Sequence, residues 1–219
     1  MPPYSAFIFD MNGTMVDDMH YHELAWYKIL VNELKANLSR EEVKHQMYGK
    51  NEEMLERVFG AHKFSKEEVD DIAGRKEARY REEFLPDLKL IKGLDSLLIK
   101  AKANNIGLAI GTAAIPANVD FILSNLKLWE YFPVIITADD VSTSKPHPDV
   151  FLKAAERLSI APDRCIVFED SPKGIEAARR AGMQAVGITS YHSAEELKND
   201  NVLCIVNDYS DPILNQLIW

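Results

Sequence analysis

The sequence has little cysteine and no long apolar run. Two of its 219 residues are cysteine, and each lies in a short apolar segment. That is too few for a disulfide framework, so we expect Cys165 and Cys204 to be buried, reduced thiols of a cytoplasmic protein. No apolar stretch approaches the length of a membrane span, and we expect no signal peptide ahead of the first apolar segment. These absences argue against a disulfide-rich secreted protein and against a membrane protein.

Basic residues are also in short supply. The chain has 25 lysine and arginine residues against 34 aspartate and glutamate residues, which gives a formal net charge of −9 at pH 7. A chain of this charge is not expected to bind nucleic acid or an anionic membrane, although a local pocket can still hold a small anion. The length suits one large domain, or a domain with a smaller insertion, and we expect a monomer.

Six short apolar runs predict the strands of a buried parallel sheet. Most are continuous rather than alternating in polarity, which is typical of strands covered on both faces. Helical patterns lie between them, and this alternation indicates an α/β fold with a Rossmann-like, three-layer core. The predicted strands are residues 6–10, 107–111, 134–137, 165–168, 185–188 and 203–206. The predicted helices are residues 93–105, 116–126, 149–158 and 172–181, and one further helix opened by the capping box of Ser193 and Glu196.

One long segment interrupts the alternation after the first predicted strand. It contains no convincing strand. Residues 22–35 have a helical pattern, and two capping-box patterns, Ser39 with Glu42 and Ser65 with Glu68, predict further helices within it. We therefore expect a helical cap domain inserted into the α/β core. The predicted domains are a core of residues 1–17 and 86–219 and a cap of residues 18–85.

Acidic residues stand at two predicted strand ends, where ligands bind in a parallel sheet. Asp10 ends the first strand, and Glu169 and Asp170 follow the fourth. Together with the carbonyl oxygen of Asn12, these carboxylates suit a hard cation such as Mg²⁺, which completes its shell with water and phosphate. Each acid alone is equally a helix cap, and one member of an acid pair often supports the other instead of touching the metal. Their shared sheet edge favours metal binding.

Two further residues at this edge suit a phosphate group. Thr112 follows a glycine at the end of the second predicted strand, and its hydroxyl and the next backbone N–H groups, starting at Ala113, can hold phosphate oxygens. Lys145, followed by Pro146, would add a point charge. Each alone is an ordinary strand-end or loop residue. As a set with the acids they predict phosphoryl transfer, in which Asp10 is either a metal ligand only or also the nucleophile that forms an aspartyl-phosphate.

Taken in order along the chain, these residues resemble the motifs of the haloacid dehalogenase superfamily of phosphatases and phosphomutases. Each motif alone is weakly specific, but all four occur in the right order over the whole chain, with a helical cap after the first strand. The resemblance implies that Asp10 is the nucleophile and that Mg²⁺ is the cofactor. The matching residues are Asp10-Met-Asn12-Gly-Thr14 for the first motif, Thr112 for the second, Lys145-Pro146 for the third and Glu169-Asp170 for the fourth.

Asn12 departs from that pattern, because the superfamily has a second aspartate at this position. That aspartate is the general acid and base, and its backbone carbonyl binds Mg²⁺. Asparagine keeps the carbonyl but transfers no proton, and general acid–base catalysis contributes about 10²–10⁴-fold to a rate. We therefore hypothesise that this chain is an inactivated form of an active enzyme, most simply through an Asp→Asn change.

Within the superfamily the chain is similar to beta-phosphoglucomutase and its sugar-phosphatase relatives. This similarity implies that His22 is a hinge residue and that Lys76 faces the substrate. That group grips a distal phosphate with a cap arginine, whereas this chain has Glu52 at the arginine's position and Lys50 nearby. Glutamate would repel phosphate and Lys50 would replace the arginine only in part, which favours a hydrolase. Without the resemblance, His22 is a structural histidine and Lys76 a solvated side chain.

The predicted function is Mg²⁺-dependent hydrolysis of a small phosphorylated metabolite, most simply a sugar phosphate, through an aspartyl-phosphate on Asp10. Two alternatives stay open. The first is a beta-phosphoglucomutase, an isomerase that interconverts glucose 1-phosphate and glucose 6-phosphate. The second is a catalytically inactive phosphosugar-binding protein. No sequence pattern selects the substrate.

Overall fold

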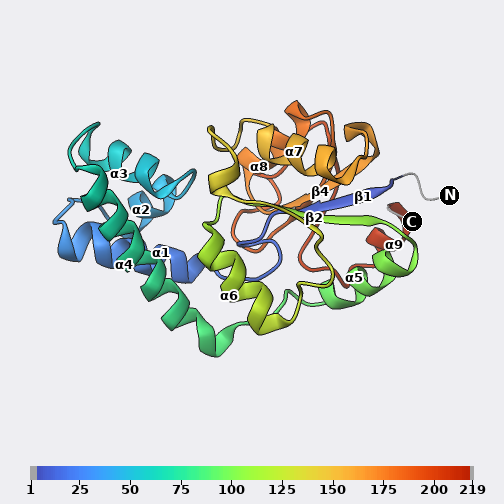
Figure 1. Ribbon diagram of the computed structural model, residues 1–219, viewed down its shortest axis with the longest axis horizontal. Coiled ribbons are helices and arrows are strands. Elements are labelled where there is room, and N and C mark those ends of the chain that lie inside the picture. Colours follow the sequence, from blue (N-terminus) through green and yellow to red (C-terminus); the bar gives the residue numbers. More distant parts are fainter. Residues whose placement is uncertain (1–3, 218–219) are drawn as a thin grey trace. The chain divides into compact units, whose positions relative to one another are not determined.

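The computed structural model describes residues 4–217, which form two compact units (Figure 1). The core unit joins the chain up to Asp17 to the chain from Lys89 onward, and the helical unit is Asp18–Leu88. The core unit carries a parallel sheet with helices on both sides, and the helical unit has its own apolar centre.

The core unit contains a six-stranded parallel sheet, which confirms the predicted fold class. The strand order is β3-β2-β1-β4-β5-β6, so the first strand lies in the interior of the sheet, paired in parallel with β2 and β4. The strands are β1 (Ala6–Phe9), β2 (Gly107–Gly111), β3 (Val134–Ile136), β4 (Cys165–Glu169), β5 (Gln184–Ile188) and β6 (Val202–Val206).

Helices cover both faces of this sheet. They are α5 (Leu94–Ala103), α6 (Pro116–Leu126), α7 (Asp149–Leu158), α8 (Pro172–Arg180) and α9 (Ile213–Leu217), with short 3-10 turns η3 (Ala138–Asp140) and η4 (Pro162–Arg164). In Figure 1, α7 and α8 lie on one side of the strands, and α5 and α6 lie on the other. The three layers agree with the Rossmann-like core that the sequence predicts.

β1 is buried on both faces, which explains its unbroken apolar sequence. Ile8 belongs to an apolar cluster with Phe151 of α7 and Ile175 of α8. Phe9 points to the opposite face, because side chains alternate along a strand. There its ring stacks on Phe168 of β4, with ring centroids 4.6 Å apart. Burying each of these side chains contributes about 1.5–3 kcal/mol and fixes the strand whose end carries Asp10.

One predicted helix is absent from the part of the chain that the structure describes. Ser193 and Glu196 form the reciprocal hydrogen bonds of a capping box, but only turns follow before β6. Two asparagine side chains compete with the helix by bonding backbone groups. Asn199 Oδ1 accepts a hydrogen bond from the N–H of Asp200 at 2.8 Å, and Asn201 Nδ2 donates to two main-chain carbonyls in and after α8.

The two cysteines are free thiols, as predicted, but they differ in burial. Cys165 in β4 is buried, whereas Cys204 is only half-buried because β6 is an edge strand. Burial raises the pKa of each thiol to about 11, so neither is a reactive thiolate at neutral pH.

The helical unit consists of α1 (Met19–Tyr27), its π-helical continuation η1 (Lys28–Glu33), α2 (Arg40–Gln46), α3 (Asn51–Phe59), α4 (Lys66–Phe84) and the short η2 (Leu85–Asp87). The two predicted capping boxes form at the starts of α2 and α4. Its apolar core includes Trp26, Leu30 and Ile72. Neither α3 nor α9 has a counterpart among the predicted helices. Among the described residues, every helix is too short or too polar to cross a lipid bilayer.

Candidate active site

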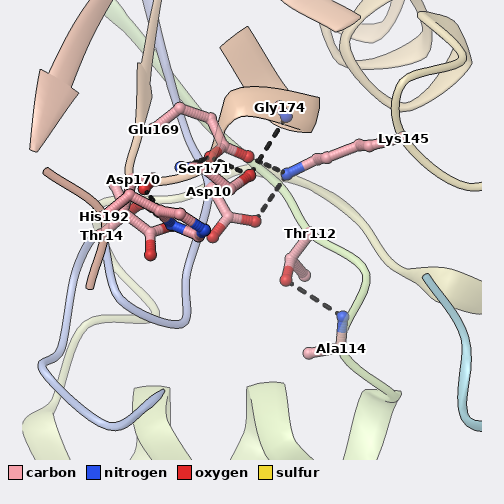
Figure 2. A network of polar contacts seen from close by, with 10 residues as sticks. All are labelled: Asp10, Thr14, Thr112, Ala114, Lys145, Glu169, Asp170, Ser171, Gly174 and His192. Carbon is pink, nitrogen blue, oxygen red and sulfur yellow. Dashed lines mark hydrogen bonds and ion pairs between the residues drawn. The ribbon is translucent and has the colours of Figure 1, made fainter. Parts of the chain in front are cut away.

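Four of the predicted site residues meet at the carboxyl edge of the core sheet (Figure 2). Asp10 directly follows β1, Glu169 ends β4, Asp170 is the next residue, and Lys145 comes from the loop between η3 and α7. The N–H of Asp10 donates to the carbonyl of Phe168 at 3.0 Å. This bond extends the β1–β4 pairing by one residue and places Asp10 beside Glu169.

Lys145 bridges two of these carboxylates. Its Nζ lies 2.7 Å from Asp10 Oδ1 and 2.6 Å from Glu169 Oε1. Burial alone would lower the pKa of Lys145, but the two carboxylates outweigh it and hold that pKa above its usual value. Lys145 is therefore a fixed positive charge at this edge of the sheet.

The carboxylates outnumber the cations at this edge. Burial raises the pKa of Asp10 to about 6, and Glu169 adds to the rise while Lys145 opposes it. With all acids ionised, Asp10, Glu169 and Asp170 carry three negative charges against the single charge of Lys145. A second cation beside Asp10 would favour its ionised form. The charge balance thus suits a bound metal ion.

The oxygen donors also fit a hard metal ion. Carboxylate oxygens of Asp10, Glu169 and Asp170 all lie within 4.8 Å of one another, and all three residues are buried. An all-oxygen set of this kind suits Mg²⁺ better than a softer metal. Glu169 is the weaker candidate for direct coordination, because its Oε1 accepts from Lys145 and its Oε2 accepts from the N–H and hydroxyl of Ser171.

The start of α8 is shaped around Glu169. Ser171 caps the helix, and its Oγ accepts a hydrogen bond from the N–H of Gly174 at 3.1 Å. A Cβ atom at position 174 would lie 1.8 Å from Glu169 Oε1. The Glu169 carboxylate therefore lies against the first turn of α8, where the partial positive charge of the helix N-terminus stabilises it.

Asn12 lies in a tight turn after β1. The carbonyl of Met11 accepts hydrogen bonds from the N–H groups of Thr14 at 3.3 Å and Met15 at 2.8 Å. Gly13 has a φ of 73°, a conformation that favours glycine. Asn12 is half-buried and pairs with Val16 in an isolated bridge. The backbone hydrogen bonds that form this turn do not use the Asn12 side chain, so an amide in place of a carboxyl leaves them in place.

Thr112 directly follows β2 and is buried. Its N–H donates to the carbonyl of Ile136 at 2.9 Å, and its Oγ1 accepts a hydrogen bond from the N–H of Ala114 at 3.1 Å. The hydroxyl can still donate its proton. Ala113 lies between these two residues, in the short turn that leads into α6. Figure 2 shows Thr112 and Ala114 below Lys145, joined to each other by this hydrogen bond.

The residues predicted to bind substrate from the cap all lie in the helical unit, and two of them are in contact. His22 Nδ1 lies 2.6 Å from Lys76 Nζ, which also lies 3.0 Å from Glu77 Oε1. Lys76 is 2% exposed, so its interpretation as a solvated side chain is wrong. Lys50 is instead the residue before α3, and its N–H donates to Glu53 Oε2 at 2.8 Å.

Three polar residues around Asp170 were not among the predicted site residues. Thr14 Oγ1 donates to Asp170 Oδ1 at 3.3 Å, and His192 Nδ1 lies 2.9 Å from the Asp170 carbonyl oxygen. The hydroxyl of Tyr209 donates to the carbonyl of Thr14 at 2.9 Å. His192 and Tyr209 follow β5 and β6, so the rule that ligand sites lie beyond strand ends would have pointed to both loops.

Comparison with known proteins agrees with this arrangement. Residues 7–188 match the model of the haloacid dehalogenase-like hydrolases. Beta-phosphoglucomutase of Bacillus subtilis is 33% identical over 190 residues, which cover 84% of this chain and 82% of the relative. Fructose-1-phosphate phosphatase of Escherichia coli is 31% identical over 188 residues, covering 84% and 96%. The crystal structure of beta-phosphoglucomutase from Clostridium difficile has a TM-score of 0.82 at 29% identity, covering 99% of this chain and 94% of that one.

Proposed function

Because this chain belongs to the haloacid dehalogenase-like hydrolase family, we propose that it is a Mg²⁺-dependent phosphatase of a small sugar phosphate whose turnover is slowed by Asn12. The relatives include both a sugar phosphatase and a phosphoglucomutase, which supports phosphoryl transfer. The observation that carries the proposal is the buried contact of Lys145 with Asp10 and Glu169, next to Asp170. This contact supports the proposal because it groups the proposed nucleophile, its counter-charge and the oxygens proposed to bind the metal.

Asp10 is the nucleophile of the proposed reaction. Its carboxylate oxygen forms a bond to phosphorus while the bond between phosphorus and the sugar oxygen breaks, which gives an aspartyl-phosphate. Water then attacks phosphorus, the bond to Asp10 breaks and inorganic phosphate leaves. Lys145 offsets negative charge on the transferring group, and the hydroxyl of Thr112 and the N–H of Ala113 hold its oxygens in line.

Mg²⁺ is the proposed cofactor, and its ligands would be the carboxylates of Asp10 and Asp170 and the main-chain carbonyl of Asn12. Glu169 would support this set through Lys145 and Ser171, which its two oxygens contact. When bound, the ion supplies charge neutralisation at the transferring phosphoryl group.

Asn12 limits the proposed reaction at its two proton transfers. The leaving sugar oxygen needs a proton, and the attacking water must lose one. An aspartate at position 12 would exchange that proton, whereas an amide does not titrate and exchanges none. The chain as it stands should therefore bind metal and substrate better than it turns substrate over.

A mutase is the second candidate, because a beta-phosphoglucomutase is 33% identical to this chain. A mutase must hold a bisphosphate at both ends in turn. Glu52 stands where the mutase resemblance calls for an arginine, and a carboxylate there opposes a second phosphate. This difference favours hydrolysis.

The deciding experiment is an Asn12→Asp variant assayed with Mg²⁺ against sugar monophosphates and pyrophosphate, with glucose 1,6-bisphosphate added in parallel reactions. If the protein is a phosphatase, the Asn12→Asp variant releases phosphate with a kcat about 10²–10⁴-fold higher than that of the parent chain. A mutase interconverts glucose phosphates and releases little phosphate. A binding protein shows sugar-phosphate binding and no turnover in either form, which would refute the proposal.

The matched control is Asn12→Ala, which removes the amide and adds no acid. The intact mass of the parent protein must be checked, because asparagine before glycine loses ammonia readily and becomes a mixture of aspartate and isoaspartate. The backbone nitrogen of Gly13 has no side chain to shield it when it attacks the Asn12 amide. The aspartate part of a deamidated fraction would mimic the Asn12→Asp variant.

We propose that His22, Lys76 and Lys50 contribute to binding the sugar part of the substrate, which predicts a raised KM with little change in kcat for their single variants. We also propose that the chain acts as a monomer in the cytoplasm. Analytical ultracentrifugation and imaging of a tagged chain test these two points.

A further inference from the structure

We propose that His192, assisted by Tyr209 and Ser190, positions the two loops that carry the Mg²⁺ ligands. Each bonds a main-chain carbonyl of a ligand-bearing loop. The inference rests on the proposed Mg²⁺ site, but its test does not depend on turnover.

His192 fixes the backbone at Asp170. Its Nδ1 lies 2.9 Å from the Asp170 carbonyl oxygen. A carbonyl oxygen only accepts hydrogen bonds, so Nδ1 must carry the proton in this contact. Asp170 sits between the end of β4 and the cap residue of α8, where the chain changes direction. The hydrogen bond to its carbonyl fixes the orientation of the peptide group after Asp170, and this restricts the backbone that carries the Asp170 side chain (Figure 2).

Tyr209 holds the same acid indirectly. Thr14 Oγ1 donates to Asp170 Oδ1 at 3.3 Å, and the Tyr209 hydroxyl donates to the Thr14 carbonyl at 2.9 Å. Tyr209 is 5% exposed, and its ring lies 5.6 Å from that of Phe168, centroid to centroid. Burial raises the pKa of Tyr209 well above its usual value, so the hydroxyl keeps its proton and remains a donor. Asp170 is thus held at its carbonyl and at its carboxylate.

Ser190 connects the same loop to the first motif. Its Oγ donates to the carbonyl of Gly13, the residue after Asn12. β5 is not a neighbour of β1 in the sheet, because β4 lies between them. The loop after β5 therefore reaches across β4, with Ser190 bonded to the turn after β1 and His192 bonded to the residue after β4. One short loop sets the spacing between the two ligand-bearing turns.

Hydrogen bonds that support metal ligands from behind affect metal affinity, because reorienting a misplaced ligand when the metal binds costs free energy. Loss of a supporting partner typically weakens metal binding by about 10–100-fold. His192, Tyr209 and Ser190 all bond main-chain carbonyls, so they hold the backbone of the two loops directly. Only the further link from Thr14 to the Asp170 carboxylate depends on a side chain of these loops. The expected signature is weaker Mg²⁺ binding in a protein that remains folded.

The test is calorimetric titration of Mg²⁺ alone into the full chain and its variants, with melting curves recorded in a chelator. We expect His192→Ala and Tyr209→Phe each to raise the Kd for Mg²⁺ by about 10-fold or more. His192→Asn keeps an N–H close to the position of Nδ1, so it should recover most of the affinity. A purely structural histidine would lower the melting temperature and leave the Kd unchanged.

The matched controls remove the same groups elsewhere. His45→Ala deletes an exposed ring, and Tyr21→Phe deletes a hydroxyl that donates to Asp87. Neither should change the Kd. If the parent chain binds no Mg²⁺, the proposed metal site is wrong. If the parent binds Mg²⁺ and His192→Ala and Tyr209→Phe bind it equally well, the metal site stands and the positioning role is refuted.

Discussion

Gly174 leaves no room for a side chain against Glu169. A Cβ atom at position 174 would lie 1.8 Å from Glu169 Oε1 and 1.9 Å from its carboxyl carbon. The glycine thus lets a carboxylate rest on the first turn of α8 while the same carboxylate contacts Lys145. The requirement comes from the active site rather than from the helix, because a helix interior ordinarily favours alanine over glycine.

Gly174→Ala should therefore damage the site and the fold together. The new methyl group displaces the Glu169 carboxylate, which breaks its bond with Lys145 and costs about 1–3 kcal/mol of stability, as overpacking does. Phosphate release in the Asn12→Asp background should fall sharply. Chemical denaturation and a phosphate assay measure the two effects.

Gly74→Ala is the matched control for that variant. Gly74 lies in α4, and a Cβ atom there would have nothing within 4 Å. Alanine in a helix interior is favoured over glycine by about 0.5–1 kcal/mol, so this variant should be as stable as the parent or more stable. Equal stability and turnover of Gly174→Ala and Gly74→Ala would contradict the described position of Glu169.

Lys145→Met tests the charge balance of the site. It leaves Asp10 and Glu169 buried without their shared cation, so the folded protein should lose stability. Removing a charge-stabilising group from a transition state costs about 10²–10³-fold in kcat, and we expect a loss of this size in the Asn12→Asp background. Lys145→Arg keeps the charge in a planar, forked group, so it should recover stability but only part of the kcat. Steady-state kinetics and urea denaturation separate these outcomes.

The fold and the centre of the site follow from the sequence because both depend on local signals. A strand buried on both faces has an unbroken apolar run, which locates β1 and β4 and their ends. The carboxyl ends of parallel strands share one edge of the sheet. Asp10 and Glu169 are therefore expected to meet, although they are 159 positions apart in the sequence (169 − 10). Their contact with Lys145 bears out that logic geometrically.

The errors occur where the outcome depends on distant parts of the chain. Lys76 lies in a highly charged helix, so its sequence neighbourhood suggests a solvated side chain, but packing of α1 against α4 buries it beside His22. The capping box of Ser193 forms without a helix, because the Asn201 side chain further on bonds main-chain carbonyls in and after α8. His192 was missed because its partner, the Asp170 carbonyl, follows β4, whereas His192 itself follows β5.

Lys76→Met should be strongly destabilising. It removes the cation from Glu77, which is 4% exposed, and breaking one partner of a buried ion pair costs about 3–5 kcal/mol. The double variant Lys76→Met/Glu77→Gln removes both charges and should recover a large part of that loss. Arg75→Met is the neighbouring control. Its ion pairs with Glu33 and Asp71 are partly or fully exposed, so it should cost less than about 1 kcal/mol. Equal effects of the two single variants in urea denaturation would rule out a buried pair.

His22 should make the stability of the protein depend on pH. Burial lowers the pKa of His22 from 6.5 to about 3, with the charge of Lys76 adding to the fall and Glu77 opposing it. The other groups that face the ring are Asp18, whose Oδ2 lies 3.7 Å from Nε2, and the ring of Tyr80. The folded protein thus keeps this histidine neutral. Its contribution to stability is fully present above pH 6.5 and is lost as the pH falls toward about 3, because only the unfolded chain takes up the proton.

His22→Asn removes that titration while keeping an oxygen that can accept from Lys76. The parent should therefore lose more free energy of unfolding than His22→Asn when the pH falls from about 7 to about 5. His45→Asn is the matched control, because it makes the same substitution at an exposed histidine. Urea denaturation at both pH values gives the comparison. Parallel pH profiles of stability for the parent and His22→Asn would contradict this prediction. They would show that His22 takes up a proton as readily in the folded protein as in the unfolded chain, although its ring is buried beside the Lys76 ammonium.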